Sequence, residues 1–294
     1  MMSRYVKRLN VRLIQLTTSA RVNQLNMKKP AVKTTQSVDK VLNILAHFME
    51  AGRSELSITE MSQNLKMPKS TVCRLVKTLQ DKGYLAQNPH NGKYLLGLKL
   101  FELGSQVPHI KKLRDTSFFH MEQLRQATES TIHIAVLDNN EALYIVKVQA
   151  KATTELISTI GKRAPVYCTA VGKVLLAYLP PQALDHILKN ITFKRYTPKT
   201  ICSSTLLQKE LSKVREQGYS VDNYEYQNLC LCVGAPIRQN DGQVVAALSI
   251  SQVTTEINTE KINNFSRLAK MSAANISREL GYSDSLTQGV AFWT

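Results

Sequence analysis

Residues 57–82, SITEMSQNLKMPKSTVCRLVKTLQDK, predict two short helices joined by a tight turn. Apolar residues of the second helix recur at i, i+3, i+4 and i+7 and form one stripe, Val72, Leu75, Val76 and Leu79. Pro68 suits the first turn of this helix, and Gly83 suits the position after its end. Because the stripe must be buried, the opposite face, which is basic and rich in hydroxyl groups, is left to contact another molecule.

The helix before the turn has its own start signal. Ser57 and Glu60 form the S-x-x-E pattern of a capping box, and Lys66 and Met67 provide the turn. Upstream, five apolar residues follow helical spacing and are expected to cover the pair: Val38, Val41, Leu42, Leu45 and Phe48. Three helices with one shared core predict a helix-turn-helix domain.

A short hairpin is expected directly after these helices. Residues 84–87 and 94–96 have the composition of strands, and Asn91-Gly92 between them is a strong hairpin dipeptide. The sequence therefore predicts a winged helix-turn-helix over residues 36–97, whose second helix would lie in the major groove of DNA. The predicted DNA-contacting residues are those of the helix face and the wing: Ser70, Thr71, Arg74, Lys77, His90 and Lys93. The same spacing also suits a three-helix module that binds a protein or nothing.

The distribution of charge favours DNA as the partner. Residues 1–35 contain eight basic and no acidic residues, and residues 36–106 contain nine basic and six acidic ones. These 106 residues therefore carry +11 of the net charge of +16. Such an asymmetry suits a polyanion, because released counterions supply much of the affinity. A solvated basic tail accounts for part of it. Membrane binding is the weaker interpretation, because no stretch reaches the roughly 18 apolar residues of a spanning helix.

Residues 1–35 form a basic extension outside the expected fold. They lack the sustained apolar core of a signal peptide. Met27 opens a second, more ordinary start, and one hypothesis places the true start of translation there. Otherwise the extension is a disordered basic arm. The lack of a secretory signal predicts a cytoplasmic protein.

Length and composition indicate two domains. With 294 residues and 43% apolar content, the chain can bury a sizeable core. Five cysteines without a C-x-x-C pair indicate reduced thiols rather than a disulfide framework. A linker helix is predicted at residues 98–108, which Gly104 and Pro108 interrupt. Residues 109–284 then form the second domain, and residues 285–294 a tail.

The second domain mixes helices with paired strands. Helical patterns cover residues 110–129, 169–178, 182–189, 204–217 and 259–280. Strand-like runs cover residues 131–137, 142–148, 229–237 and 243–251. Helices gathered beside an antiparallel sheet predict an α+β fold.

The start of one helix in this domain suggests a ligand site. Thr169 is the expected N-cap of a helix that begins TAVGK, and Gly172 allows a backbone or a ligand to approach closely. Free N–H groups and the positive end of the helix dipole attract a carboxylate. Equally well, Thr169 only caps the helix and Gly172 only packs.

Strand alternation places further polar groups on one face of the sheet. Cys230 and Cys232 are expected to share a face, with Leu229 on the other, and Ser249 and Ser251 share a face of the later strand. Buried hydroxyl groups need partners, either the neighbouring backbone or a polar ligand.

Several motifs, in their order and spacing, resemble the IclR family of transcriptional regulators. The motifs are KSTVCRLVKTL followed by KGYL, the LKLFELG linker, P-x-Y-x-T-A-x-G-K-V-L-L-A at residues 165–177, REQGY at 215–219 and ALSIS at 247–251. The likeness runs from about residue 38 to residue 282. Within the family, TIHIAVLD, STIGKRAPVY and FKRYTPKTI resemble the KdgR branch, whose members sense 2-keto-3-deoxygluconate.

The resemblance implies a GAF-like domain that binds an effector and forms oligomers. It implies a homodimer or tetramer on a palindromic double-stranded DNA operator, no cofactor, and a small carboxylate effector such as 2-keto-3-deoxygluconate. The implied effector-binding residues are Thr169, Ala170, Val171, Gly172, Asp222, Cys232, Ser249 and Ser251. Many relatives have glycine where this chain has Leu229, so the loop before Cys232 departs from the family pattern. The implied role is a repressor of a sugar-acid catabolic operon, with an activator, or a sensor of another carboxylate, as the alternative.

The chain lacks the sequence motifs of the enzyme classes considered. No G-x-S-x-G, H-E-x-x-H or phosphate-binding G-x-x-x-x-G-K-[ST] occurs, so no catalytic residue is expected. His133 is expected to be a core residue, and Asp222 with Glu225 is expected to shape a loop. Cys230 and Cys232 lack the further ligands of a zinc site, and no metal is expected. A ligand-free dimerisation domain is the remaining competitor.

Overall fold

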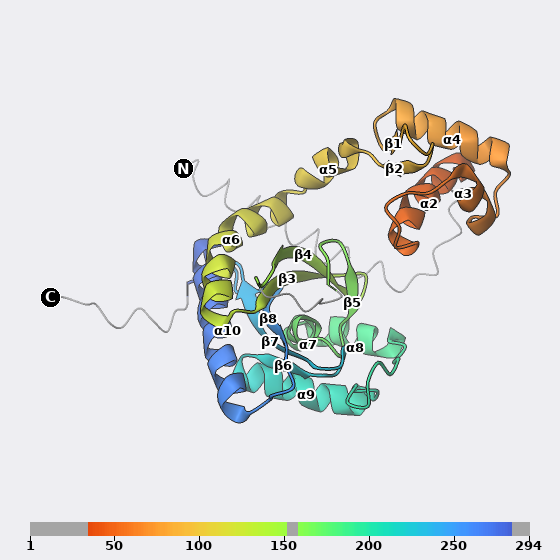
Figure 1. Ribbon diagram of the computed structural model, residues 1–294. Coiled ribbons are helices and arrows are strands. Elements are labelled where there is room, and N and C mark those ends of the chain that lie inside the picture. The colour runs from red at the N-terminus through yellow and green to blue at the C-terminus, as the bar shows by residue number, and fades with distance from the viewer. Residues whose placement is uncertain (1–34, 152–157, 284–294) are drawn as a thin grey trace, which may run out of the picture. The chain divides into compact units, whose positions relative to one another are not determined.

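The computed structural model describes residues 35–151 and 158–283 (Figure 1). The predictions for the N-terminal extension and for the tail lie outside these residues, apart from residue 35. The chain divides into two compact units, one up to Gly104 and one from Ser105 onwards. Each unit has its own apolar core. In the described residues no helix has the length and apolar character needed to cross a membrane.

The first unit is a winged helix-turn-helix. Its helices are α2 (Gln36–Glu50), α3 (Ile58–Asn64), α4 (Lys69–Asp81) and α5 (Leu98–Ser105), and its strands are β1 (Leu85–Gln87) and β2 (Tyr94–Leu96). The strands pair antiparallel as the wing. The predicted stripe of α4 is buried. Ser57 and Glu60 make both hydrogen bonds of the capping box, which confirms the predicted start of α3.

Two details of the turn around α4 follow from local backbone geometry. Lys66 has a φ of 53°, so it reverses the chain between α3 and α4 in the left-handed region. Gly83 follows α4 with a φ of 76°, as expected for a glycine after a helix end. Pro68 is the N-cap of α4, one position before the predicted first turn, because its ψ of 137° is extended.

The predicted buried stripe of α2 was partly wrong. Val38 and Leu42 are 53% and 56% exposed, whereas Ile44 is fully buried and Phe48 is 5% exposed. Val41 and Leu45 pack against the same core. The residues that face the core therefore follow i, i+3, i+4 and i+7 from Val41. Because α2 carries apolar residues around more than one side, spacing alone did not select the buried side.

The second unit is built on one antiparallel sheet of six strands in the order β5-β4-β3-β8-β7-β6. The strands are β3 (Thr131–Asp138), β4 (Glu141–Val148), β5 (Arg163–Pro165), β6 (Ser220–Asn223), β7 (Cys230–Arg238) and β8 (Val244–Val253). The four longer strands lie where the sequence predicted them. The edge strands β5 and β6 were not predicted, because strands of three and four residues are too short to show an alternating pattern.

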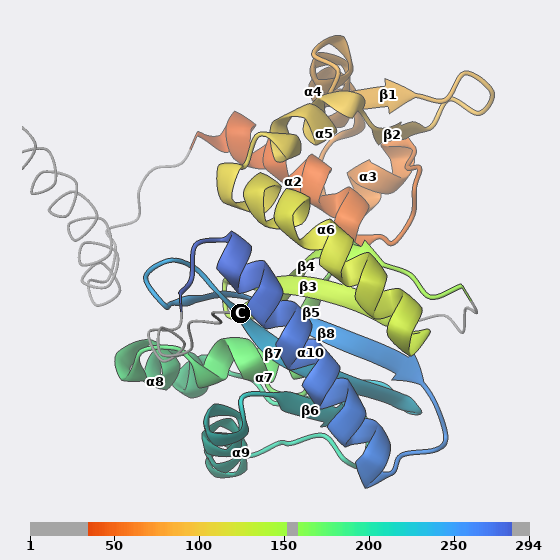
Figure 2. The same ribbon diagram turned by 90° about the vertical axis from the view of Figure 1, so that its left-hand side faces the viewer.

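Helices cover both faces of this sheet (Figure 2). Helices α6 (Pro108–Thr128) and α10 (Thr259–Glu279) pack on one face, and α7 (Ala170–Ala177) packs on the other. Helices α8 (Pro181–Asn190) and α9 (Ser204–Gln217) lie on the α7 side. The two faces have separate apolar cores, and the strands β3, β4 and β8 contribute buried residues to both. This confirms the predicted α+β domain.

Leu229 was wrongly assigned to the strand. It precedes β7, has a φ of 60° and is 47% exposed. A residue in that conformation cannot continue the alternation of the strand, so Leu229 does not share a face with Leu231. The left-handed region favours glycine, which fits the glycine expected at this position in relatives.

Candidate functional site

The predicted DNA-contacting residues lie on the exposed side of the first unit. Ser70, Arg74 and Lys77 project from α4 opposite its buried stripe, and Thr71 is half-buried beside them. Lys77 lies 3.8 Å from Asp81, one turn further along the helix, and both side chains are exposed. Such an exposed pair leaves the lysine accessible to phosphate.

The wing is held in place by an acidic side chain that the sequence analysis did not single out. Glu55 accepts hydrogen bonds from Asn88 Nδ2 at 2.7 Å and from Asn91 Nδ2 at 2.8 Å. These hydrogen bonds hold the pKa of Glu55 below its ordinary value. The exposed His90 and the half-buried Lys93 are thereby carried on a fixed loop.

The predicted effector residues come together in the second unit. Seven of the eight line one pocket between the sheet and the start of α7: Thr169, Ala170, Val171, Asp222, Cys232, Ser249 and Ser251. Strand register explains why they meet. Asp222 lies opposite Cys232, which lies opposite Ser251, so three strands contribute one row. Ser249 lies opposite His133 in the next row on the same face.

Gly172 is the exception. A Cβ atom at this position would lie 2.4 Å from Val166 Cα and 2.6 Å from Val166 O, so the glycine is required by close backbone packing. Its N–H donates to Thr169 Oγ1 at 3.2 Å. Gly172 is not among the residues that line the pocket, and its N–H is already satisfied. The packing alternative therefore describes its surroundings better than direct contact with a ligand.

The start of α7 offers hydrogen-bond donors to the pocket. Thr169 is the N-cap, and its hydroxyl donates to Pro165 O at 2.7 Å while it accepts from Gly172. The first intrahelical bond runs from Lys173 N to Thr169 O. The N–H groups of Ala170 and Val171 have no acceptor in the described part of the chain, as is usual for a first helical turn. They lie at the positive end of the helix dipole.

Hydroxyl and imidazole groups line the facing sheet. His133 is buried, contacts Ser158 Oγ at 2.7 Å and contacts Ser251 Oγ at 3.3 Å. Burial, together with the charge of Lys147, lowers the pKa of His133 to about 3, so the imidazole is neutral. Ser249 is 3% exposed, and its hydroxyl has no hydrogen-bond partner among the described residues. It is a polar group that a ligand can satisfy.

Asp222 is the carboxyl group of the pocket. Its Oδ1 accepts from the N–H groups of Glu225 at 2.7 Å and Tyr226 at 3.4 Å, which closes a turn and confirms the predicted loop-shaping role. Burial is the largest influence on this group and raises the pKa of Asp222 to about 7, while Lys173 opposes the rise. A substantial fraction of Asp222 is therefore protonated near neutral pH and can donate a hydrogen bond.

Other pocket residues were missed by the sequence analysis. They are His133, Tyr144, Ser158, Lys162, Arg163, Tyr226, Gln227 and Cys230. His133 lies in the pocket because it pairs with Ser249 on the neighbouring strand. This pairing can be recognised only when the order of the strands in the sheet is known. Residues of the connecting loops carry no periodic signal.

The two cysteines of β7 face the pocket together. Cys230 Sγ and Cys232 Sγ are 3.5 Å apart. Contact with Cys230 and burial raise the pKa of Cys232 well above its ordinary value, so it is a neutral thiol. Within the described residues no group of three or more His, Cys, Asp or Glu side chains is arranged to hold a metal ion.

Comparisons with known proteins cover both units. A family model described as the IclR helix-turn-helix domain matches residues 37–89, and one described as the bacterial transcriptional regulator IclR C-terminal domain matches residues 106–278.

Two relatives from Escherichia coli (strain K12) have similar lengths. The HTH-type transcriptional regulator XynR is 38% identical over 247 residues, which cover 84% of this chain and 98% of XynR. The HTH-type transcriptional regulator KdgR is 38% identical over 253 residues, which cover 86% of this chain and 96% of KdgR. The crystal structure of the Thermotoga maritima IclR matches with a TM-score of 0.70 and 34% identity, and covers 84% of this chain and 99% of that one. These proteins are regulators and not enzymes.

Proposed function

The chain belongs to the IclR family of transcriptional regulators, and from this premise we propose that it is a repressor that a small carboxylate effector releases from its operator. The effector we favour is 2-keto-3-deoxygluconate, and the regulated genes would then serve sugar-acid catabolism. The observation that carries this proposal is the meeting of seven predicted effector residues in one pocket at a helix start.

Operator binding would use the exposed face of α4. Arg74 is suited to bidentate hydrogen bonds with guanine in the major groove, and Ser70 and Thr71 to phosphate or base contacts. Lys77 would face the major groove from the same side of α4, and His90 and Lys93 would contact the phosphate backbone. A homodimer would place two such helices about 34 to 36 Å apart, or a multiple of that, on a palindromic operator.

The pocket has the donors that a carboxylate needs. The N–H groups of Ala170 and Val171 point from the positive end of α7, and protonated Asp222 supplies a further donor. Ser249 and Ser251 can bind the hydroxyl groups of a sugar acid. XynR is as similar to this chain as KdgR is, and a different small carboxylate is therefore the second candidate effector.

The pocket must widen to admit such a ligand. Its cavity of about 30 Å³ has room for water-sized molecules, whereas pockets that hold small organic ligands are about 300 to 1,000 Å³. The effector would consequently bind a state in which the pocket is open. It can shift the regulator away from its operator only through its different affinity for the two states.

Thermal unfolding with and without ligand tests the proposal. We expect 2-keto-3-deoxygluconate to raise the unfolding temperature of the protein and to release it from its operator in a mobility-shift assay, because a ligand that binds only the folded state stabilises it by mass action. Ser249→Ala should weaken effector binding about fivefold, which corresponds to about 1 kcal/mol for one hydrogen bond, and leave operator affinity unchanged.

The matched control is Ser212→Ala, because Ser212 lies on α9 and, among the described residues, its hydroxyl bonds only within that helix, to Gln208 O and Arg215. If Ser249→Ala bound 2-keto-3-deoxygluconate as tightly as the unaltered protein does, this would contradict the assignment of the effector to the pocket. A stabilising effect of another oxo-acid, with none from this compound, would select the second candidate effector. No response to any sugar acid or oxo-acid would favour a ligand-free dimerisation domain.

A further inference from the structure

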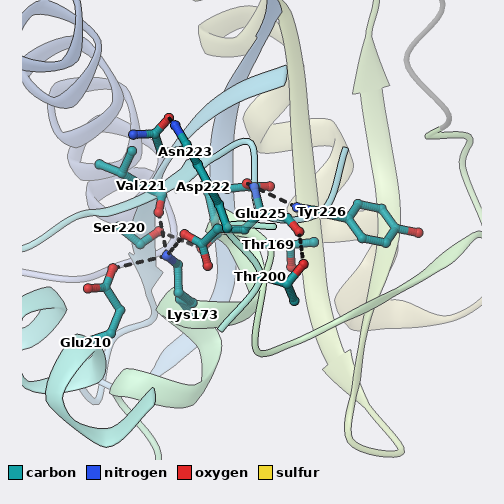
Figure 3. Close-up of polar contacts among 12 residues, drawn as sticks. Thr169, Lys173, Thr200, Glu210, Ser220, Val221, Asp222, Asn223, Glu225 and Tyr226 are labelled. Atoms are coloured by element: carbon teal, nitrogen blue, oxygen red, sulfur yellow. Dashed lines mark hydrogen bonds and ion pairs between the residues drawn. The ribbon is translucent and has the colours of Figure 1, made fainter. Parts of the chain in front are cut away.

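Lys173 is a buried cation directly beside the pocket, and the proposed function gives it no role. It lies on α7, one helical turn after the residues that line the pocket, and its side chain is 0% exposed (Figure 3). It is not itself one of the lining residues. A fully buried ammonium group is rare in proteins unless it is paired.

The ammonium group of Lys173 contacts three acceptors on three different segments. It donates to Glu210 Oε1 on α9 at 3.1 Å, to Val221 O on β6 at 2.5 Å and to Glu225 Oε1 in the following turn at 2.6 Å. An ammonium group has three hydrogens, so these contacts use all of them. Burial alone would lower the pKa of Lys173, but Glu225 and Glu210 outweigh it and raise the pKa above its ordinary value. The group is charged.

The turn that Lys173 holds is the one that brings pocket residues into place. Glu225 lies between Asp222 and Tyr226, which both line the pocket. The backbone of this turn is fixed from two further directions: its N–H groups donate to Asp222 Oδ1, and Glu225 O accepts from Thr200 Oγ1 at 2.7 Å. Only Lys173 connects the turn with the helix that supplies Thr169, Ala170 and Val171 by a charged contact among the described residues.

We propose that Lys173 is a positioning residue of the effector site: its ion pair with Glu225 fixes the turn of residues 222–226 against α7 and thereby sets effector affinity without touching the effector. This inference rests on the proposed function of the pocket. Lys173 joins the two sides from which a carboxylate would be held, namely the helix start and the Asp222 turn. A displacement of the helix start or of the Asp222 turn would therefore move the other segment through the ion pair of Lys173 and Glu225.

The competing explanation is that the ion pair only stabilises the fold. The two explanations can be separated by the way in which buried ion pairs respond to substitution. Replacing both partners by apolar residues of similar volume often leaves stability unchanged or higher, whereas removing one partner leaves an unpaired charge. Lys173→Met combined with Glu225→Met therefore removes the contact while keeping the packing volume. Glu210 loses its partner as well, but its side chain is 23% exposed and can be solvated.

Amide hydrogen exchange on the full chain is the first measurement. In the double variant we expect the N–H groups of Glu225 and Tyr226 to exchange at least tenfold faster than in the unaltered protein, and those of the β3 and β4 pair to exchange at the same rate. Lys213→Met with Glu216→Met is the matched control, because it removes one lysine and one glutamate from the exposed side of α9. Unchanged exchange of the turn in the double variant would overturn the proposal, whatever the effector.

Effector affinity is the second measurement, with 2-keto-3-deoxygluconate as the probe in calorimetric titrations. We expect the double variant to bind it at least tenfold more weakly while its unfolding temperature and operator affinity stay close to those of the control. Normal affinity in the double variant, together with weakened binding in Ser249→Ala, would refute the positioning role and leave the pocket assignment intact. Unchanged affinity in both variants would instead refute the proposed effector site. No binding of 2-keto-3-deoxygluconate by the unaltered protein would refute this compound as the effector, and faster exchange of the turn would still assign Lys173 to holding it.

Discussion

The two candidate sites of this protein are built in different ways. The predicted DNA-contacting face lies on one helix of 13 residues, with the wing beside it. The pocket takes residues from β3, β4, β5, β6, β7, β8 and the start of α7, which are far apart in the chain. A site on one helix tolerates changes elsewhere in its unit as long as the helix remains folded. A site assembled from many segments depends on every contact that aligns them.

The largest difference is expected between two glycines, one beside each candidate site: Gly172 lies next to the pocket, and Gly83 follows the end of α4. Gly172→Ala should lower the free energy of unfolding by about 3 kcal/mol, because the new Cβ would overlap the backbone of Val166 and the backbone must move. Gly83→Ala should cost only about 1 kcal/mol, because a Cβ there meets only Lys99 Cβ at 3.8 Å and the cost comes from the positive φ.

Urea denaturation followed by circular dichroism measures both changes. Gly104→Ala is the control, since its Cβ would have no neighbour within 4 Å and its backbone needs no positive φ. If the Gly172→Ala and Gly83→Ala variants lost the same free energy of unfolding, the backbone beside the pocket would be no more sensitive to packing than the turn after α4.

A smaller change is expected at Arg74 on α4. Arg74→Ala should weaken specific operator binding by about 2 kcal/mol, because it removes one bidentate base contact, and it should leave effector affinity unchanged. Arg53→Ala is the control, since Arg53 is equally basic but pairs with Glu60 at 2.9 Å. Fluorescence anisotropy with operator and random duplex would measure both variants. If Arg74→Ala lost the same affinity for operator and for random duplex, Arg74 would contact phosphate and would not read a base.

The smallest change is a pH dependence of the pocket. Burial raises the pKa of Asp222 to about 7, so the protonated, donating form predominates below pH 7. As the pH rises through this value, Asp222 becomes anionic and repels a carboxylate. Effector affinity should therefore fall about tenfold between pH 6 and pH 8, and a tenfold change in affinity corresponds to about 1.4 kcal/mol.

Calorimetric titration of the unaltered protein and of Asp222→Asn at several pH values tests the direction of this change in effector affinity. Asparagine keeps a side-chain oxygen for the N–H group of Glu225 but does not ionise in this range. The variant should show a flat profile. A profile that stays steep in the variant would assign the titration to another group.

Local patterns predicted the elements whose signal is contained in a short stretch. The capping box at Ser57, the buried stripe of α4 and the N-cap at Thr169 all appear where the sequence placed them. The errors occurred where the spacing of apolar residues alone did not decide the outcome. Two apolar sides of α2 competed, so Ile44 was overlooked, and Leu229 left the strand because of its backbone conformation.

The sequence by itself determined that a basic helical face precedes a second domain and which hydroxyl and thiol groups alternate toward one side of its longer strands, because these patterns repeat within a few residues. Only the tertiary structure decided that Asp222, Cys232 and Ser251 stand in one row, that Gly172 is a packing contact and that Lys173 is a buried cation. Strand order and the burial of a side chain depend on residues that are distant along the chain, and no local spacing carries that information.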